Sequence, residues 1–542
     1  MIGGAAYGIM GNVVAGPDLG PVAASGMADI VVYQDEGSVN AWNAGKSRME
    51  ASGADAASII QSAVDVSKGG GKVLILAGAY SLRSPVVAVD GVTIQGVFGG
   101  GTILRGHGLT MPHGVANVTI RDLSFSGDGA SDIAILGLDR SHDVLIEGCR
   151  FTGYIYSVQH VLVTGEESFW DWRLRDNIVQ NMHATHEQNY ALGLSNVERG
   201  EIIGNTVLNV GATAIKVLGT SNNIVVSENR VQDAGLSFQD MSGITVGITS
   251  VGHAMTNIVV ANNMVENSGD GFRTHGYLIS AEGNRNCYGQ GIVVSGNVYN
   301  DRQSGDSKGH GIYVHGASVY NATFNARSIV VSGNSIYGAK CGIVTALSCS
   351  VSIVGNSVAD SFLHGIRISA SSFCIVEGNT ILNAGLGGVG SGIKLDGPDT
   401  RFNNIVGNSI LDMASTMASG IAEVNQPNYN NIANNVIARG PLDAWSNMAF
   451  PDAICRVGSN TVVRDNLGYK LENSGTAIML NGTCSVVVEH NLSQTPSRVI
   501  VSGTSCEMGS LYVGNITPTH FTVFSQNAAC GDSKIYWYAE SC

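Results

Sequence analysis

The sequence predicts an all-β fold in which a single chain winds into a parallel β-helix of about 13–15 coils, with an α-helical cap at its start. Three observations support this prediction. Short β-branched segments recur along the chain and end in similar turns. Helical periodicity is almost absent after residue 70. Gly is frequent, at 71 residues, and Pro is rare, at 10, which favours tight turns over a disordered or collagen-like chain.

The recurrent phrase is an apolar run, a small or polar residue, Gly or a similar residue, Asn, and then a polar and an apolar residue. Typical copies are IIGNTV at 202, VVSGNVY at 293 and IVGNSV at 353. The Asn residues stand at 205, 229, 263, 297, 334, 356, 379 and 408, so successive differences are 24, 34, 34, 37, 22, 23 and 29. The shortest coil therefore has about 22 residues, and longer coils carry inserted loops. Asn tolerates left-handed geometry and its amide can bond to the next coil, so we expect these residues to be structural.

The segment before the coils, residues 55–96, predicts the cap. Ala57, Ile60, Ala63 and Val64 have the spacing of one helix face, and the three glycines at 69–71 end the helix. VLILAG at 73 is the first buried strand, and GVTIQG at 91 opens the first coil. A helix here covers the end of the apolar stack, which is otherwise a free sheet edge.

The domain boundaries follow from these elements. Residues 1–50 are an N-terminal arm and lead-in, residues 51–515 the capped β-helix, and residues 516–542 a Cys-containing C-terminal end. The N-terminal stretch has no Lys or Arg before Lys46, so it lacks the basic region of a secretory signal. It is also too interrupted to span a membrane. An extracellular, virion or cell-surface location is expected from the architecture and not from a signal.

The ten cysteines leave two alternatives open. Their spacing contains no CxxC or Cys/His zinc signature, so no metal site is predicted. Cys484, Cys506, Cys530 and Cys542 lie close to the C-terminus. They suit disulfides in an oxidising compartment, or else the cysteines are free thiols buried in a β core.

The charge balance excludes some partners. The formal net charge is -14, with only 29 Lys and Arg residues. No basic stripe is available to neutralise nucleic-acid phosphates or to bind an anionic membrane surface. An acidic polymer must therefore be held by local Arg and Lys side chains, against the overall field.

Residues 55–96 resemble the N-terminal cap and first coil of the pectate-lyase-like superfamily of right-handed β-helices. The shared pattern is Asp, a helix with paired alanines, Gly-Gly, a short strand, AGAY, and the GVTIQG strand. With the later coils, the resemblance covers about residues 55–515 and implies a right-handed helix. That superfamily includes polysaccharide lyases, polygalacturonase-like hydrolases, uronate epimerases and viral tail spikes, so it implies carbohydrate chemistry or glycan binding. It also admits calcium, which many related lyases use, although no unambiguous acidic ligand cluster is visible.

The second strand of each coil carries the candidate catalytic residues. DGFRTHG at 270 and HGIYVHG at 310 align position by position, and side chains alternate along a strand. Stacking two such coils puts matching polar residues side by side on the outward face. The predicted patch contains Asp270, Arg273, His275, His310, Tyr313 and His315. Ordinary solvated side chains of an outward sheet face are the alternative interpretation.

Candidate substrate-binding residues surround this patch. Arg285, Arg302 and Lys308 lie in the long inserts beside it, where β-helix enzymes wall a groove. Arg367 and Lys394 continue the outward column of Arg273 and Tyr313. Trp170 and Trp172, in FWDWRLRDN, form a second candidate region for stacking on sugars.

Two reactions fit these residues. β-Elimination on a uronate needs a cation for the carboxylate, a base for the adjacent proton and an acid for the leaving oxygen. Arg273 or Arg285 suits the first role, His315, His275 or Lys308 the second, and Tyr313 the third. Hydrolysis needs two carboxylates, for which Asp270, Asp301 and Asp306 are candidates. GHG at 309 resembles a polygalacturonase motif, but that family's paired aspartates are missing here.

The sequence thus predicts an extracellular enzyme that cleaves an anionic, uronate-containing polysaccharide, with β-elimination as the favoured reaction. One alternative is a viral tail spike or surface fibre that binds glycans without catalysis, as a homotrimer. A polygalacturonase-like glycoside hydrolase is the other.

Overall fold

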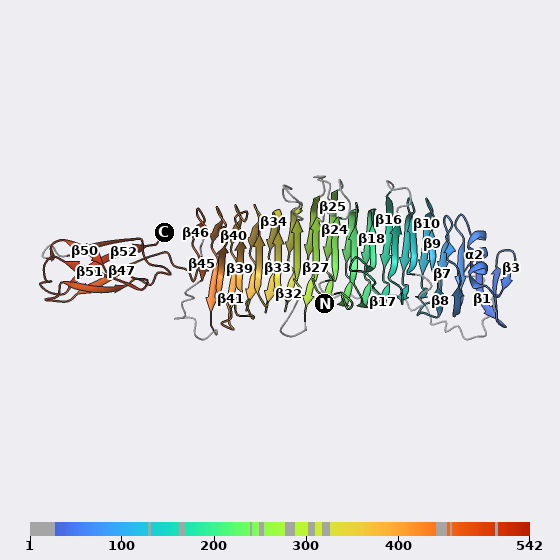
Figure 1. Cartoon of the computed structure of the whole chain (residues 1–542), viewed down its shortest axis with the longest axis horizontal. Helices are drawn as coiled ribbons and strands as arrows, with labels where there is room; N and C mark the ends of the chain where they lie inside the picture. Colours follow the sequence, from blue (N-terminus) through green and yellow to red (C-terminus); the bar gives the residue numbers. More distant parts are fainter. Residues whose placement is uncertain are drawn as a thin grey trace, which may run out of the picture. The chain divides into compact units, whose positions relative to one another are not determined.

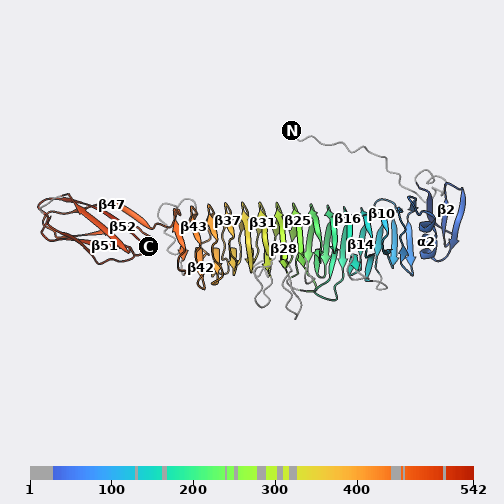
Figure 2. The same cartoon turned by 90° about the horizontal axis from the view of Figure 1, so that it is seen from above.

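The computed structural model of the chain describes residues 28–127, 132–161, 168–238, 241–248, 254–276, 288–301, 309–316, 326–440, 453–455, 458–504 and 508–541. The chain divides into two compact units, residues 1–238 (unit 1) and residues 239–542 (unit 2). Both units contain short parallel strands stacked coil upon coil (Figures 1 and 2). No helix among the described residues has the length and hydropathy needed to cross a membrane.

Unit 1 begins with a small antiparallel sheet that was not predicted. Its strands are β1 (Ile30–Asp35), β2 (Ser38–Asn43) and β3 (Arg48–Gly53). β1 also pairs in parallel with the first strand of the coils. Part of the predicted arm at residues 1–50 is therefore ordered sheet, which shields the first coil from solvent.

The predicted cap helix is confirmed as α2 (Ala56–Val66), which lies beside β2 at the start of unit 1 (Figure 2). Asp55 is its N-cap residue, and Ile60, Ala63 and Val64 are fully buried. Gly69 and Gly70 end the segment with left-handed φ values of 89° and 126°. Gln61 attaches the helix to the first coil, because its side chain exchanges two hydrogen bonds of 2.7 and 3.0 Å with the backbone of Val87.

Three stacks of parallel strands form the coils of unit 1. Sheet A contains β4 (Lys72–Ile75), β7 (Thr93–Gln95), β10 (Ala116–Arg121), β13 (His142–Glu147), β16 (Phe169–Arg175), β19 (Val197–Ile203) and β22 (Asn222–Ser227). Sheet B contains β5 (Gly78–Leu82), β8 (Thr102–Gly106), β11 (Ser124–Ser126), β14 (Arg150–Thr152), β17 (Ile178–Met182), β20 (Thr206–Val210) and β23 (Arg230–Ala234). The third side consists of sheet C, with β6 (Val86–Val87), β9 (Leu109–Met111), β12 (Ile133–Leu138) and β15 (Tyr156–Val161), and then of β18 (Tyr190–Ser195) and β21 (Thr213–Leu218).

Unit 2 repeats this arrangement, with sheet D on the third side. Sheet A contains β25 (Ala254–Ala261), β28 (Tyr288–Ser295), β31 (Ala326–Ser332), β34 (Ser348–Val354), β37 (Ile375–Glu377), β40 (Asn404–Val406), β43 (Asn431–Ala433) and β46 (Val462–Arg464). Sheet B contains β26 (Met264–Glu266), β29 (Val298–Asn300), β32 (Ser335–Tyr337), β35 (Ser357–Ala359), β38 (Thr380–Leu382), β41 (Ser409–Asp412) and β44 (Val436–Arg439). Sheet D contains β24 (Ile244–Ile248), β27 (Phe272–Gly276), β30 (Ile312–Gly316), β33 (Cys341–Ala346), β36 (His364–Ser369), β39 (Ser391–Asp396), β42 (Ser419–Val424) and β45 (Ile454–Cys455).

Asparagine side chains join each coil to the next at the turn between sheets A and B. Asn356 is 1 % exposed, and its backbone N–H and side-chain Nδ2 both donate to Oδ1 of Asn379 at 2.9 Å. The same Nδ2 donates at 2.9 Å to the carbonyl of Val331 on the preceding coil. In unit 2 this ladder runs through Asn263, Asn297, Asn334, Asn356, Asn379, Asn408, Asn435 and Asn466. The structural role predicted for these Asn residues is confirmed.

The residue before each ladder asparagine explains the Gly of the repeated phrase. Gly333, Gly355 and Gly378 have φ values of 63–64°, a region that glycine enters without the steric cost of a Cβ. The left-handed residue turns the chain from sheet A to sheet B and leaves the next amide inside the coil. The Gly-Asn pair is therefore one structural device.

The parallel coils end earlier than predicted, at β46. Residues 472–540 instead form two antiparallel sheets around a core that includes Met479, Phe521 and Trp537. Their strands are β47 (Glu472–Met479), β52 (Ser533–Glu540) and β49 (Arg498–Gly503) in one sheet, and β48 (Ser485–Glu489), β51 (His520–Ser525) and β50 (Leu511–Gly514) in the other. The phrases VVEHNL at 487 and LYVGNI at 511 resemble the coil repeat in sequence, but Asn491 and Asn515 in them adopt the left-handed turn themselves, with φ values of 51° and 48°.

The two C-terminal cysteines that the structure describes form no disulfide. Cys484 and Cys530 carry free, exposed thiols, and Cys506 and Cys542 lie outside the described residues. Cys149 and Cys374 are buried free thiols, as the alternative interpretation expected. Burial raises the pKa of each of these two thiols to about 12.

This difference predicts selective thiol chemistry. At about pH 8 iodoacetamide should modify Cys484 and Cys530 in the folded protein and spare Cys149 and Cys374, because the thiolate is the reactive form and burial suppresses it. Peptide mass spectrometry measures the sites, and unfolding in urea should make all four react. Protection of Cys484 and Cys530 that only a reducing agent removes would restore the disulfide interpretation.

The ladder predicts an unequal cost for two neighbouring substitutions. Asn379→Ala should lower the free energy of unfolding by about 2–5 kcal/mol, because it leaves buried N–H and C=O groups of two coils without partners. Thr380→Ala, at the exposed next position, should cost less than about 1 kcal/mol. Urea unfolding of the two variants measures both, and equal losses would contradict a structural role for the ladder.

Candidate functional site

The outward face of sheet D in unit 2 holds the predicted patch. β27 and β30 pair in parallel, with Arg273 opposite Tyr313 and His275 opposite His315, so the predicted register is confirmed. The side chains of Arg273 and His275 lie outside the described part of the structure, as do Arg285, Arg302, Asp306 and Lys308.

Three aromatic side chains form a row along β30. Ile312 and Val314 are fully buried, while Tyr313 and His315 are partly exposed, as strand alternation requires. His310, which precedes the strand, is also partly exposed. The ring centroid of Tyr313 lies 5.1 Å from that of His310 and 5.2 Å from that of His315. The phenol is thus flanked by two imidazoles on one accessible face.

Asp270 lies beside His310, and its carboxylate is hydrogen-bonded to the backbone. It is 6 % exposed, and its Oδ1 accepts a 2.8 Å hydrogen bond from the N–H of His310 on the next coil. Such a carboxylate fixes the turn that presents His310. Its burial makes it a positioning residue and not an acid that a polymer can reach.

A charged cluster occupies the same face three coils further on. Asp396 Oδ2 lies 2.7 Å from Arg367 Nη2 and 3.5 Å from Lys394 Nζ, and Oδ1 accepts a 2.8 Å bond from Asn425 Nδ2. Burial acts to raise the pKa of Asp396, but the bond from Asn425 and the charges of Lys394 and Arg367 outweigh it, so the pKa is lowered. Two cations therefore share one carboxylate, and Arg367 Nε is a buried donor with no acceptor among the described residues.

Sequence reasoning named Arg367 and Lys394 but omitted the groups that orient them. Asp396 follows Lys394 by two residues in SGIKLDG, so alternation alone put both on one face. Asn425 follows β42 in a left-handed turn with a φ of 60°, which no sequence signal indicated. Val344, 4 % exposed, lies in the same column between Tyr313 and Arg367 and separates the aromatic row from the charged cluster.

His364 lies beside these groups in a buried position. Its Nδ1 accepts a 3.1 Å hydrogen bond from the N–H of Ser391, so the neutral ring carries its proton on Nε2. Burial and the positive charges of Lys394 and Arg367 lower its pKa to about 4. It is therefore a neutral side chain at physiological pH.

The predicted tryptophan pair is split by a left-handed residue. Trp170 is partly exposed and stacks on His142 with a centroid distance of 4.4 Å. Trp172 is wholly buried and donates from Nε1 to the carbonyl of Ser141 at 3.0 Å, so the prediction that it stacks on a sugar was wrong. Asp171 between them has a left-handed φ of 55°, which turns the two indoles to opposite faces.

Among the residues that the structure describes, no cluster of three or more His, Cys, Asp or Glu could hold a metal ion. Asp270 is bonded to the backbone of His310, and Asp396 is paired with Arg367 and Lys394.

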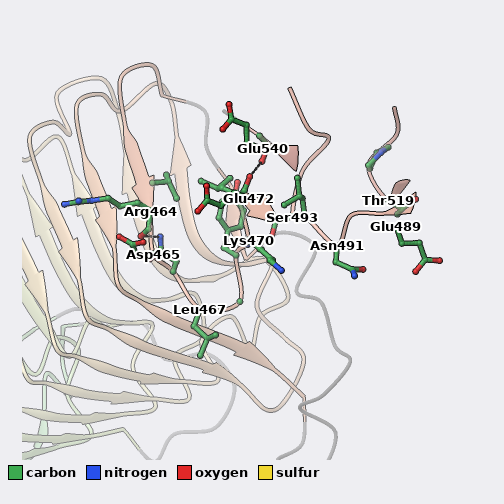
Figure 3. Close-up of a pocket in the computed structure, with 18 of the residues that line it drawn as sticks. Arg464, Asp465, Leu467, Lys470, Glu472, Glu489, Asn491, Ser493, Thr519 and Glu540 are labelled. Carbon is green, nitrogen blue, oxygen red and sulfur yellow. Dashed lines mark hydrogen bonds between the residues drawn. The ribbon is translucent and has the colours of Figure 1, made fainter. Parts of the chain in front are cut away.

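A separate cavity of about 1560 Å³ lies where residues 463–472 meet the C-terminal strands (Figure 3). Its lining includes Asp465, Glu472, Glu489 and Glu540. Glu472 and Glu540 accept hydrogen bonds of 2.7 and 2.9 Å from the hydroxyl of Tyr538. The acidic lining is unsuited to an anionic polymer, and no predicted site residue lies there.

Parallel strands stacked coil upon coil define the fold as a β-helix. Residues 78–286 and 272–437 match the right-handed beta helix region, and the chain belongs to that family. The predicted right-handed parallel β-helix is therefore confirmed. No curated protein sequence matches the chain.

Solved structures share this fold. A mutant tailspike protein of E. coli bacteriophage HK620 in complex with a pentasaccharide has a TM-score of 0.56 at 13% identity, over 90% of each chain. A second mutant of that tailspike, also with pentasaccharide, gives 0.55 at 13% identity over 90% of each chain. The A-module of an Azotobacter vinelandii mannuronan C-5 epimerase covers 76% of this chain and 94% of its own, at 16% identity and a TM-score of 0.37. At these identities the tailspike likeness is one of fold.

The buried His364 predicts a pH dependence of stability. The unfolded side chain binds a proton near pH 6.5 and the folded one near pH 4, so the unfolded state is favoured as the pH falls through this window. Stability should drop by up to about 3 kcal/mol from this group, and His364→Gln should remove that part of the slope. Urea midpoints between pH 7 and 4 measure it, with His520→Gln in β51 as control. Identical slopes in wild type and His364→Gln would disprove this assignment.

Proposed function

We propose that the chain binds an anionic polysaccharide along the outward face of sheet D in unit 2 and cleaves it by β-elimination. The observation that carries the proposal is the register of this face. It puts Arg367 and Lys394 in the same column as Tyr313 of the aromatic row, two and three coils further on. A polymer lying across the strands contacts both.

The cationic cluster supports an acidic ligand. The chain as a whole carries a formal charge of -14, yet Arg367 and Lys394 share a single carboxylate. Their surplus positive charge favours a sugar carboxylate. This local reversal of charge is what an acidic chain needs to hold an acidic polymer.

The aromatic row supports the chemical step. Elimination requires a base to take the proton beside the uronate carboxylate while the electron pair forms a C=C bond and the C–O bond to the leaving sugar breaks. We assign carboxylate binding to Arg273, proton removal to His315 or His275, and proton donation to the leaving oxygen to Tyr313. The alternation that makes Tyr313 and His315 partly exposed permits this division of roles.

Hydrolysis is a less suitable reaction for the described face. It usually needs two available carboxylates, one as acid and one as base or nucleophile. Asp270 is bonded to the backbone of His310, and Asp396 is paired with Arg367 and Lys394.

A glycan-binding spike on a virion or cell surface, assembled as a homotrimer, is the second candidate. The structural match to the HK620 tailspike favours this candidate, because it extends over 90% of both chains. That tailspike structure is a complex with a pentasaccharide. In that case the sheet D face binds the glycan and leaves it intact.

Incubation with a panel of uronate polymers tests elimination. The ultraviolet absorbance of the unsaturated product should rise with the wild-type chain, and the double variant Arg273→Ala/Tyr313→Phe should abolish it. Tyr337→Phe, an exposed tyrosine of sheet B, is the matched control and should retain full activity.

The outcomes separate the candidates. New reducing ends without absorbance would replace elimination by hydrolysis. Glycan binding with neither signal would leave the spike. Full activity in the double variant would remove the sheet D face as the site.

A further inference from the structure

A second groove lies on the outward face of sheet A in unit 1, and its volume is about 400 Å³. We call it the sheet A groove. It is lined chiefly by Asp143, Asp171, Arg173, Arg199, Glu201 and Asn223, from strands β13, β16, β19 and β22. Its volume is near the lower end for small-molecule sites, which suits a mono- or disaccharide.

A repeated backbone irregularity builds the groove. Asp143, Asp171, Arg199 and Asn223 are left-handed, with φ values of 52°, 55°, 61° and 57°. Each lies between two paired positions of its strand, opposite the left-handed residue of the neighbouring strand, so the register is unchanged and the four residues lie in one column. A left-handed arginine is uncommon and is retained only where the surroundings impose it.

Most charges in the groove have partners of their own. Arg199 holds Asp171 through two hydrogen bonds, of 3.0 and 2.9 Å, and His142 Nδ1 lies 2.7 Å from Asp143 Oδ2. Glu201 is paired with Arg175. The hydrogen bond from Arg199 lowers the pKa of Asp171 most, with the charges of Arg199 and Arg173 adding to it against burial.

Arg173 differs from these residues. It lies in register between Leu145 and Glu201, yet no hydrogen bond or ion pair joins its side chain to any described residue. Its Nε is buried and without an acceptor. A guanidinium carries further N–H donors on its two Nη atoms, and Arg173 lines the groove, so these donors are suited to an acidic group.

We propose that the sheet A groove binds a saccharide that carries a carboxylate, independently of the sheet D face. The carboxylate accepts hydrogen bonds from Arg173, and sugar hydroxyls bond to Asp143 and Asn223 at the groove's rim. Trp170, stacked on His142 and directly before Asp171, supplies an apolar border. Such a site lets unit 1 retain a uronate-containing chain whether or not unit 2 acts on it.

Calorimetry with glucuronate and glucose tests the proposal in the full chain. The measurements use an Arg273→Gln/Arg367→Gln/Lys394→Gln background, which removes the three cations that the proposed function places on the sheet D face. Glucuronate should still bind there and glucose should not. Adding Arg173→Gln should weaken glucuronate binding by about tenfold or more, because it removes the charged fork. Adding Arg150→Gln, at an exposed arginine of sheet B in the same unit, should change nothing.

Two further results decide the matter. Arg173→Lys, which keeps the charge and loses the fork, should bind between the parent and Arg173→Gln, and it serves if the Gln variant fails to fold. Absence of glucuronate binding in the background variant, or equal binding with and without Arg173, would overturn the proposal that the sheet A groove binds an acidic saccharide. Loss of elimination activity in Tyr313 variants bears only on sheet D.

Discussion

One side-chain amide per coil determines how every other strand is placed. The Nδ2 of each ladder asparagine donates to the next asparagine and to a carbonyl of the coil before, as Asn334 does to Asn356 and to Val294. Because the amide is buried, leaving one of its hydrogen bonds unformed costs free energy. Neighbouring coils are therefore held in a single register relative to one another. The strands of sheets A, B and D within a unit keep that register, so equivalent side chains of successive coils line up in columns on the outward faces.

The proposed function depends on these columns of outward side chains. Tyr313, Arg367 and Lys394 are far apart in the sequence, yet pairing of β30, β33, β36 and β39 puts them in one row. Two acidic residues position that row. Asp270 accepts a hydrogen bond from the backbone of His310, and Asp396 pairs with both Arg367 and Lys394. The same principle, applied through left-handed residues on sheet A, places Asp171 beside Arg199.

Sequence patterns predicted what repeats and missed what interrupts the repeat. The Gly-Asn turns and the pairing of Arg273 with Tyr313 follow from a period that every coil shares. Trp172 is buried and not exposed as predicted, because the left-handed Asp171 turns the two indoles to opposite faces. The phrases that contain Asn491 and Asn515 resemble the coil repeat, because the same residues can surround an asparagine in a left-handed turn and a buried ladder asparagine. The partnership of Asp396 with Asn425 depends on a turn conformation that has no sequence signature.

The bonding of each ladder amide to its immediate neighbours has an evolutionary consequence. A coil whose ends satisfy Asn334 on one side and Asn379 on the other can be duplicated or deleted without creating an unpaired amide. Each duplication lengthens the polymer-facing surface by about 4.8 Å and leaves existing side chains in place. Ligand length can therefore change by gain or loss of whole repeats, while the chemistry of individual residues is conserved.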